Sequence, residues 1–250
     1  AYKNTSYDPE NKYSVPYTWG TVGVIYNKKY VSESDIGSWD LLWNEKYSGK
    51  ILMFDNPRDA FAIAELLLGI DINSEDQDEL RSATYKLIEQ KPLVQDYVMD
   101  QIFSKMEREE AWIAPYYAGD YLTMLENNED LAFVIPEEGS NWFVDAMCVL
   151  KTAQHKEEAE AWINFIASTE SNLANMDYIW YASPNAEALA EYPAYYEEQY
   201  GEPLDEEIYN IMAIPDEERE RCEIYVNLPQ ETLKFYDKLW TCLLYTSDAA

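Results

Sequence analysis

Residues 139–150 read GSNWFVDAMCVL and set a carboxylate inside a segment that predicts a buried strand. Asp145 follows the aromatic residues Trp142 and Phe143 and precedes a run of Ala, Met, Cys, Val and Leu. A carboxylate is costly to desolvate unless a positive group meets it. The segment therefore raises the question of which positive group meets the Asp145 carboxylate.

Two further segments combine acids and aromatics where a strand gives way to a helix. FDNPRDAF sets Asp55 and Asp59 around a helix start, and AWIAPYYAGDY sets Trp112, Tyr116 and Tyr117 before another. Proteins of the α/β class bind ligands outside the carboxyl ends of their strands. Taken singly, the acids suit a helix dipole and the aromatics suit a core. Taken together, the three segments favour a cation held between aromatic faces.

The sequence contains none of the common catalytic motifs, such as GxSxG, Walker A, CxxC or HExxH. Its single histidine, His155, opens a charged helical segment and is expected to be solvated. Cys148, Cys222 and Cys242 have no metal-binding spacing, and an odd count makes no disulfide framework. A carboxylate pair that cleaves glycosides stays open as an alternative, but 48 acidic residues give that signal no specificity.

Composition favours a globular protein with an acidic surface. The chain has 250 residues, of which 47% are hydrophobic, so it can bury a core in one large domain or two modest lobes. Its 48 Asp and Glu against 18 Lys and Arg give a formal net charge of −30, which repels nucleic acid and attracts cations. No window is apolar enough for a membrane span, and the first residues show no signal-peptide pattern.

Strand and helix patterns alternate along the chain, which predicts an α/β fold. The clearest helix follows a cap at Asn56, with Pro57 in its first position and Gly69 just past its end. A second helix is expected after Ser74, with an apolar side that includes Ile88. The other expected helices are 38–47 with Ser38 as cap, 119–127, 155–169 with Trp162 and Ile166 on its apolar side, and 230–240; the expected strands are 21–27, 51–54, 111–114, 131–136 and 142–150.

Four separated segments resemble the bacterial spermidine/putrescine-binding proteins that serve ABC importers. They are YSVPYTWGTVGVIYN, SWDLLWNEKYSGKILMFDNPRDAF, PEEGSNWFVDAMCVLKTAQHKEEAEAWINFI and YASPNAEA. The resemblance implies a type II periplasmic binding protein, with two α/β lobes joined by crossover strands and the first lobe incomplete. It divides the chain into a remnant of lobe one and the crossover (1–20), lobe two (21–143), a return segment of lobe one (144–190), a C-terminal segment packing on lobe two (191–241) and a tail (242–250).

The resemblance also implies roles for particular residues around Asp145. Asp145 matches the family's central carboxylate for an amine, with Phe143 beside it as a stacking aromatic and Trp142 next in the chain. Asp59 matches the acid that closes one end of the groove. Asn56 stands where many relatives have a second acid, so the preference between putrescine and spermidine stays open.

Two tyrosines complete the implied ligand set. Tyr117 lies near an aromatic of the family, and Tyr181 matches a tyrosine that contacts the ligand. A late polar contact falls near Val226 or Asn227 and is not assigned to either.

The implied function is solute capture without catalysis. The ligand would be a polyamine, the partners would be the permease subunits of an ABC importer, and the resemblance implies a monomer with no cofactor, no metal and no nucleic acid. The location would be the periplasm, or the extracellular side of the cell membrane as an anchored lipoprotein. A ferric-ion-binding protein of the same fold, using Tyr116 and Tyr117, stays open as the alternative.

Both ends of the chain carry expectations. The chain begins inside the family domain, so we expect the parent gene to encode a preceding part with a secretory signal, half of lobe one and several ligand contacts. The last nine residues, CLLYTSDAA, are similar to one reading frame of a transposase sequencing adapter. We expect that tail to be an artefact of assembly.

Overall fold

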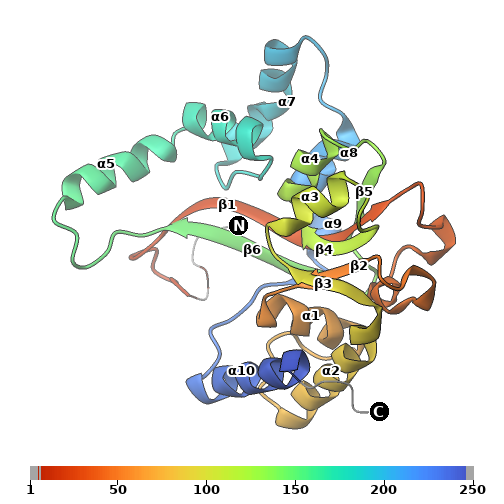
Figure 1. The fold of residues 1–250 in the computed structure, drawn as a ribbon. Coiled ribbons are helices and arrows are strands. Elements are labelled where there is room, and N and C mark those ends of the chain that lie inside the picture. The colour runs from red at the N-terminus through yellow and green to blue at the C-terminus, as the bar shows by residue number, and fades with distance from the viewer. Residues whose placement is uncertain (1–4, 6, 246–250) are drawn as a thin grey trace.

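The computed structural model describes Thr5 and residues 7–245, and its described strands form one seven-stranded mixed sheet (Figure 1). The long first strand pairs with three others along its length, and the order across the sheet is β3-β2-β4-β1-β6-β7, with β5 also on β1. The expected α/β class is confirmed. The strands are β1 Val15–Asn27, β2 Ile51–Phe54, β3 Val94–Val98, β4 Ile113–Tyr117, β5 Leu131–Val134, β6 Ser140–Met147 and β7 Cys222–Glu223.

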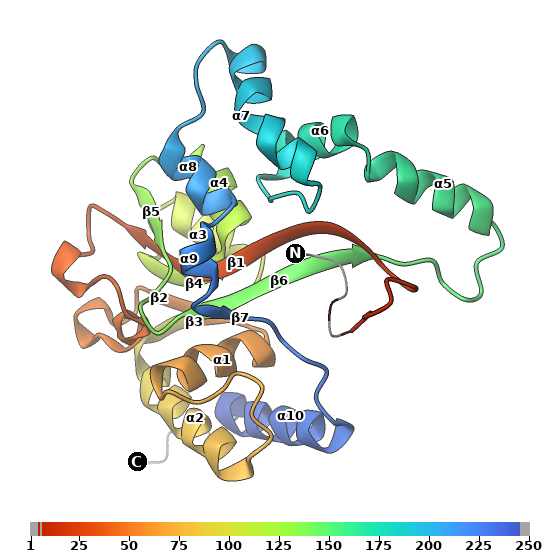
Figure 2. The ribbon, with the colours of Figure 1, turned by 180° about the vertical axis from the view of Figure 1, so that it is seen from behind.

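Helices cover both faces of the sheet (Figures 1 and 2). Helices α1, α2 and α10 pack together on one face, while α3, α4 and α8 lie on the other. The α-helices are α1 Pro57–Leu67, α2 Gln77–Gln90, α3 Gln101–Glu107, α4 Ala118–Leu125, α5 Lys156–Ile166, α6 Thr169–Ile179, α7 Ala186–Tyr200, α8 Glu206–Met212, α9 Asp216–Arg219 and α10 Gln230–Tyr245. Four short 3-10 helices complete the described elements: η1 Glu33–Asp35, η2 Trp39–Trp43, η3 Glu45–Tyr47 and η4 Lys91–Leu93.

The helix that follows β2 forms as its sequence predicts. The Asn56 side chain accepts a hydrogen bond from the Arg58 amide, and Pro57 occupies the first position, where it has no amide to satisfy. Gly69 follows the last turn at φ +69°, a left-handed conformation that glycine adopts without steric cost. Strand β2 is buried along its whole length and ends two residues before this cap. The cap therefore sets where the first turn of α1 begins beside the sheet.

Helix α2 begins after Ser74 as expected; its cap is Asp76, which accepts from two amides, while Ser74 accepts from the amide of Asp76. Two local expectations are wrong. Residues 38–47 form η2 and η3 instead of one helix, because Asn44 is extended and caps the second turn. Ile88 lies at the edge of the apolar stripe of α2 and is exposed.

Two strands were not expected from the sequence, β3 and the two-residue β7. Strand β3 reads VQDYV, and only Val98 is buried, because the strand lies at the edge of the sheet. Its polar residues gave no alternating pattern to detect.

The far ends of β1 and β6 form an arm that carries α5 (Figure 1). The run after Asp145 was expected to be buried, yet Ala146 and Cys148 are exposed and Leu150 is 75% exposed. Helix α5 has no buried residue, and Trp162 on its expected apolar side is 61% exposed. The reason is geometric: α5 packs mainly on α6, and a groove of about 580 Å³ lies between it and the strand ends.

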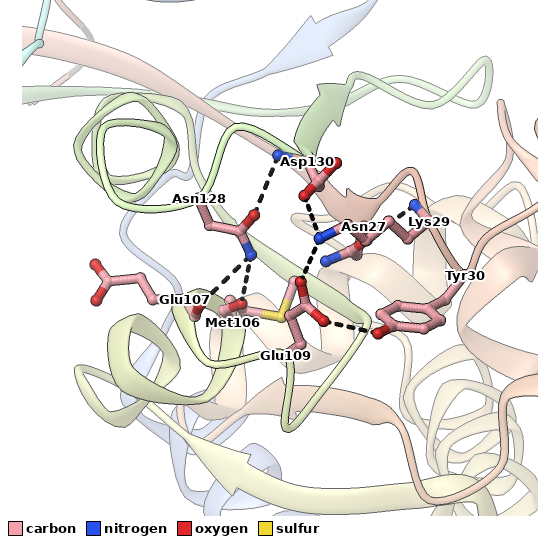
Figure 3. A network of polar contacts seen from close by, with 8 residues as sticks. All are labelled: Asn27, Lys29, Tyr30, Met106, Glu107, Glu109, Asn128 and Asp130. Atoms are coloured by element: carbon pink, nitrogen blue, oxygen red, sulfur yellow. Dashed lines mark hydrogen bonds and ion pairs between the residues drawn. The ribbon is translucent and has the colours of Figure 1, made fainter.

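At the opposite end of β1, the chain is fastened to its neighbours by a polar network (Figure 3). Lys29 Nζ lies 2.8 Å from a Glu109 oxygen and 2.6 Å from an Asp130 oxygen, and the Tyr30 hydroxyl donates to Glu109. These charges are partly exposed, so each pair adds little to the stability of the fold.

Among the helices of the described residues, none combines the length and the apolar composition that a membrane span needs.

A second buried asparagine beside Asn27 in the same network is Asn128 (Figure 3). Its amide group donates to the carbonyls of Met106 and Glu107, and its oxygen accepts from the amide of Asp130. One side chain thus joins the end of α3 to the loop before β5.

We therefore expect Asn128→Ala to lower the free energy of unfolding by about 1 to 3 kcal/mol, because buried backbone groups lose their partners. The matched control is Asn127→Ala, since Asn127 is exposed and bonds only a surface carboxylate; its effect should stay within about 0.5 kcal/mol. Urea unfolding of both variants measures the difference. Equal effects would contradict this role for Asn128.

Candidate functional site

A cleft of about 590 Å³ opens where the carboxyl ends of β2, β3 and β4 face strand β6. Parallel strands β2, β3 and β4 each lead into a loop or helix at this edge, so residues far apart in the sequence converge there. The described residues that line the cleft are Asn56, Arg58, Asp59, Met99, Asp100, Tyr116, Tyr117, Asp120, Asn141, Phe143, Asp145, Tyr181 and Tyr225.

Asp59 is the most enclosed carboxylate of the cleft, at 6% exposure. Tyr117 donates to its Oδ2 and Tyr225 to its Oδ1, each at 3.0 Å. Burial raises the pKa of Asp59, while the two phenol donors and the nearby Arg58 charge act in the opposite direction. The site thus holds a carboxylate that lacks much of its hydration and is partly stabilised by neutral donors.

Asp120 lies in the first turn of α4, three residues after Tyr117. Burial raises the pKa of Asp120 to about 6, although hydrogen bonding from Tyr181 acts to lower it. The Tyr181 ring lies against two glycines: a Cβ at Gly119 would overlap the ring, and one at Gly20 would lie 3.0 Å from it. Larger residues at these two positions would push Tyr181 toward the cleft.

Strand β6 supplies the opposite wall. Asn141, Phe143 and Asp145 alternate along it and so face the same side. In the antiparallel register Thr18 pairs with Asp145, and the Thr18 hydroxyl donates to Asp145 Oδ2 at 2.9 Å. The Phe143 ring meets the Tyr117 ring edge to face, with centroids 5.4 Å apart.

The burial that the sequence suggested for Asp145 is wrong, because its side chain is exposed. It lies on the outward part of β6, where the strand runs into the arm. Its open side faces the cleft, and Thr18 serves as its partner within the described chain.

The cleft is strongly acidic. Asp100 accepts a long hydrogen bond of 3.4 Å from Tyr116, and with Asp59, Asp120 and Asp145 it makes four carboxylates around one space. Arg58 is the one basic side chain among the described lining residues. Carboxylates around aromatic faces attract a cation with apolar segments.

Six of the seven residues predicted for the site line this one cleft: Asn56, Asp59, Tyr117, Phe143, Asp145 and Tyr181. Trp142 does not, because it lies between two cleft residues on β6 and therefore on the other face of the strand. Trp112 and Asp55, which the strand-to-helix pattern also suggested, lie outside it. Trp112 stacks on Tyr30 instead, and Asp55 is exposed.

The sequence analysis missed several lining residues. Asp120 had a usable signal, an acid in the first turn of a helix directly after two aromatics. Asp100 followed a strand that was not recognised. Tyr225 had no local signal, because its contact with Asp59 joins residues 166 positions apart.

Metal binding has no support in this geometry. Among the described residues, no group of three His, Cys, Asp or Glu side chains is arranged to hold a metal ion. The phenols of Tyr116 and Tyr117 donate to carboxylates, and burial raises the pKa of both, which disfavours the phenolates that ferric ion requires. No disulfide links the cysteines of the described residues.

Comparison with known proteins yields one consistent set of similarities. A family model described as bacterial extracellular solute-binding protein matches residues 1–199. The spermidine/putrescine-binding periplasmic protein of Escherichia coli (strain K12) is 28% identical over 185 residues, which are 74% of this chain and 53% of that protein. The putrescine/agmatine-binding protein of Pseudomonas aeruginosa is 26% identical over 198 residues, 73% of this chain and 54% of that protein.

A solved structure is similar over nearly the whole chain. The spermidine/putrescine ABC transporter substrate-binding protein PotD from Streptococcus pneumoniae is 32% identical and superposes with a TM-score of 0.81, covering 96% of this chain and 71% of that one. The chain nevertheless spans about half the length of the curated relatives that it matches.

The raised pKa of Asp120 leads to a test that needs no ligand. Because its pKa of about 6 in the folded protein exceeds the ordinary value of 3.8, the ionised carboxylate destabilises the fold above about pH 6 and ceases to do so below about pH 4. Asp120→Asn should therefore raise the free energy of unfolding by about 1 to 3 kcal/mol at pH 7.5 and change it little at pH 4.

The control for this test is Asp237→Asn, since Asp237 is exposed on α10. Urea unfolding at the two pH values should show no gain for the control. A destabilised Asp120→Asn protein at pH 7.5, or a gain that is equal at both pH values, would contradict the burial of this charge.

Proposed function

The chain belongs to the family of bacterial extracellular solute-binding proteins and has the type II periplasmic binding protein fold expected from its sequence, and from this premise we propose that it captures polyamines for an ABC importer. The observation that carries the proposal is the composition of one cleft. Four carboxylates surround it, and the aromatic rings of Tyr117, Phe143 and Tyr181 lie between them. Putrescine and spermidine are the ligands named for the relatives.

The chemistry of a polyamine fits this arrangement. At neutral pH it is a thin chain of ammonium groups separated by methylenes, so its site needs carboxylates at intervals and apolar faces between them. Each cation–π contact contributes about 0.5 to 2 kcal/mol, more when water is excluded. The carboxylates supply charge and set the register of the ligand.

Each residue has a role in the proposal. Asp59, held by two phenols, receives one ammonium group, and Asp120 and Asp145 serve another part of the ligand. Phe143 and Tyr181 cover the methylenes between them. Asn56 contributes a neutral amide beside Asp59, where its side chain also caps α1.

The cellular setting of the proposal follows the relatives. The partners are the permease subunits of an importer, the protein is a monomer that binds no nucleic acid, and it works in the periplasm or as a lipoprotein anchored outside the cell membrane. The ligand leaves chemically unchanged, so the protein is no enzyme. The lobe boundaries are those implied by the sequence: 1–20 and 144–190 belong to lobe one, and 21–143 with 191–241 belong to lobe two.

The alternatives are less consistent with the cleft. Ferric ion would require Tyr116 and Tyr117 as phenolates, whereas both keep their protons and donate hydrogen bonds to carboxylates. Glycoside hydrolysis would require catalysis, whereas the matching family model describes solute-binding proteins. A ferric site would leave the aromatic wall formed by Phe143 and Tyr181 unused.

The sharpest test compares two aspartates on either side of the same helix cap. Asp59→Asn should weaken binding of putrescine and spermidine about 30-fold to several-thousand-fold, because losing one partner of a desolvated charge pair costs about 2 to 5 kcal/mol. Asp55→Asn should stay within about threefold, because Asp55 is exposed and outside the cleft.

Calorimetry on the complete protein measures both variants, with 1,4-butanediol as an uncharged ligand of similar shape that should not bind. Equal losses for the two aspartate variants would indicate general attraction to an acidic surface. Binding of the diol as tight as that of the diamine would show that the carboxylates do not contribute to ligand binding.

A further inference from the structure

Tyr225 reaches the cleft from an irregular part of the chain. It lies between β7 and α10, just after the short strand Cys222–Glu223. A side chain on an irregular segment has a fixed position only if other groups hold its backbone. The structure shows what holds this one.

The side chain of Asn73 brackets Tyr225 from both sides. Its Nδ2 donates to the carbonyl of Ile224 at 3.0 Å, and its Oδ1 accepts from the amide of Val226 at 2.9 Å. Asn73 is itself held in place. Its backbone amide donates to the Asp71 side chain, and its Oδ1 also accepts from Arg58 Nη2 at 3.1 Å. A single amide side chain in the loop before α2 thus fixes the two peptide groups that flank Tyr225.

The ring and hydroxyl of Tyr225 are fixed as well. The Arg58 guanidinium lies over the ring, 4.5 Å from its centroid. The hydroxyl lies 3.0 Å from Asp59 Oδ1 and 3.3 Å from the carbonyl oxygen of Arg58. Tyr117 of β4 occupies the other carboxylate oxygen, so Asp59 is held at both oxygens by segments that are distant in sequence.

We propose that Asn73 and Tyr225 are positioning residues for Asp59, such that the loop before α2 and the segment after β7 set the orientation and charge of the carboxylate at that end of the cleft. The consequence for ligand capture rests on the proposed function. The effect on Asp59 itself does not, because it is a property of the protein without ligand.

The groups that face Asp59 make the effect measurable by pH. They are Arg58 of α1, Tyr116 and Tyr117 of β4, and Tyr225, with Glu65 acting on Tyr225 from the next turn of α1. Burial raises the pKa of Asp59, and the Tyr225 hydroxyl is one of two phenols that oppose the increase. Without that hydroxyl, Asp59 should ionise at higher pH.

The experiment follows the carboxyl carbon of Asp59 by NMR through a pH titration of the protein without ligand. The midpoint should move to higher pH in Tyr225→Phe, which keeps the ring, and in Asn73→Ala, which releases the segment. The control is Tyr236→Phe: Tyr236 also lies near Arg58, but its hydroxyl donates to Glu65, so the Asp59 midpoint should stay where it is in wild type.

An unchanged midpoint in Tyr225→Phe, or an equal move in Tyr236→Phe, overturns the proposal. A move in Tyr225→Phe with none in Asn73→Ala overturns the part assigned to Asn73. These outcomes do not depend on which ligand the protein takes.

Putrescine calorimetry then reads the consequence for binding. Tyr225→Phe and Asn73→Ala should each bind putrescine about tenfold more weakly at pH 7, since the carboxylate that receives the ammonium group is no longer held in place. Wild-type affinity in both variants across the pH range overturns the effect on binding. Failure of wild-type protein to bind putrescine counts against the proposed function, while the NMR midpoints still decide the positioning roles.

Discussion

The structure depends most on the enclosure of one carboxylate, Asp59, which is 6% exposed and which two phenols hold. Desolvation of a charge is costly, and neutral hydrogen bonds offset only part of it. The donors come from β4 and from the segment after β7, so the carboxylate is held only when the sheet and the C-terminal segment are both in place. The remaining cost makes the site receptive to a cation.

The strand order also brings further carboxylates close to Asp59. Strand order puts the carboxyl ends of β2, β3 and β4 side by side, which brings Asp59, Asp100 and Asp120 to one edge. Strand β6 pairs with the long strand β1 and forms the opposite wall, where Phe143 and Asp145 face the cleft. Two positions without side chains, Gly20 and Gly119, leave the space in which the Tyr181 ring lies. Carboxylates and aromatic rings therefore line the same cleft, which suits the extended cationic ligand that we propose.

Sequence reasoning could predict the parts of this site that have local signals. The cap at Asn56 and the proline after it fixed the start of α1, and with it the place of Asp59. The alternation along β6 puts Phe143 and Asp145 on one face and Trp142 on the other. Tyr225 and Asp100 could not be found, because one depends on a contact across the chain and the other on an edge strand without an apolar pattern. The burial expected for Asp145 was wrong since strand composition does not tell which elements cover the strand.

The most direct measurement of the central claim is an NMR titration of the protein with putrescine beside 1,4-butanediol, following resonances across the whole chain. The account predicts saturable shifts that gather on the residues of the cleft, with Asp59 and Phe143 among them, for the diamine alone. The formal charge of −30 makes diffuse attraction of any polyamine the competing explanation. Shifts that scatter over the acidic surface without saturating, or equal shifts with the diol, would contradict the account.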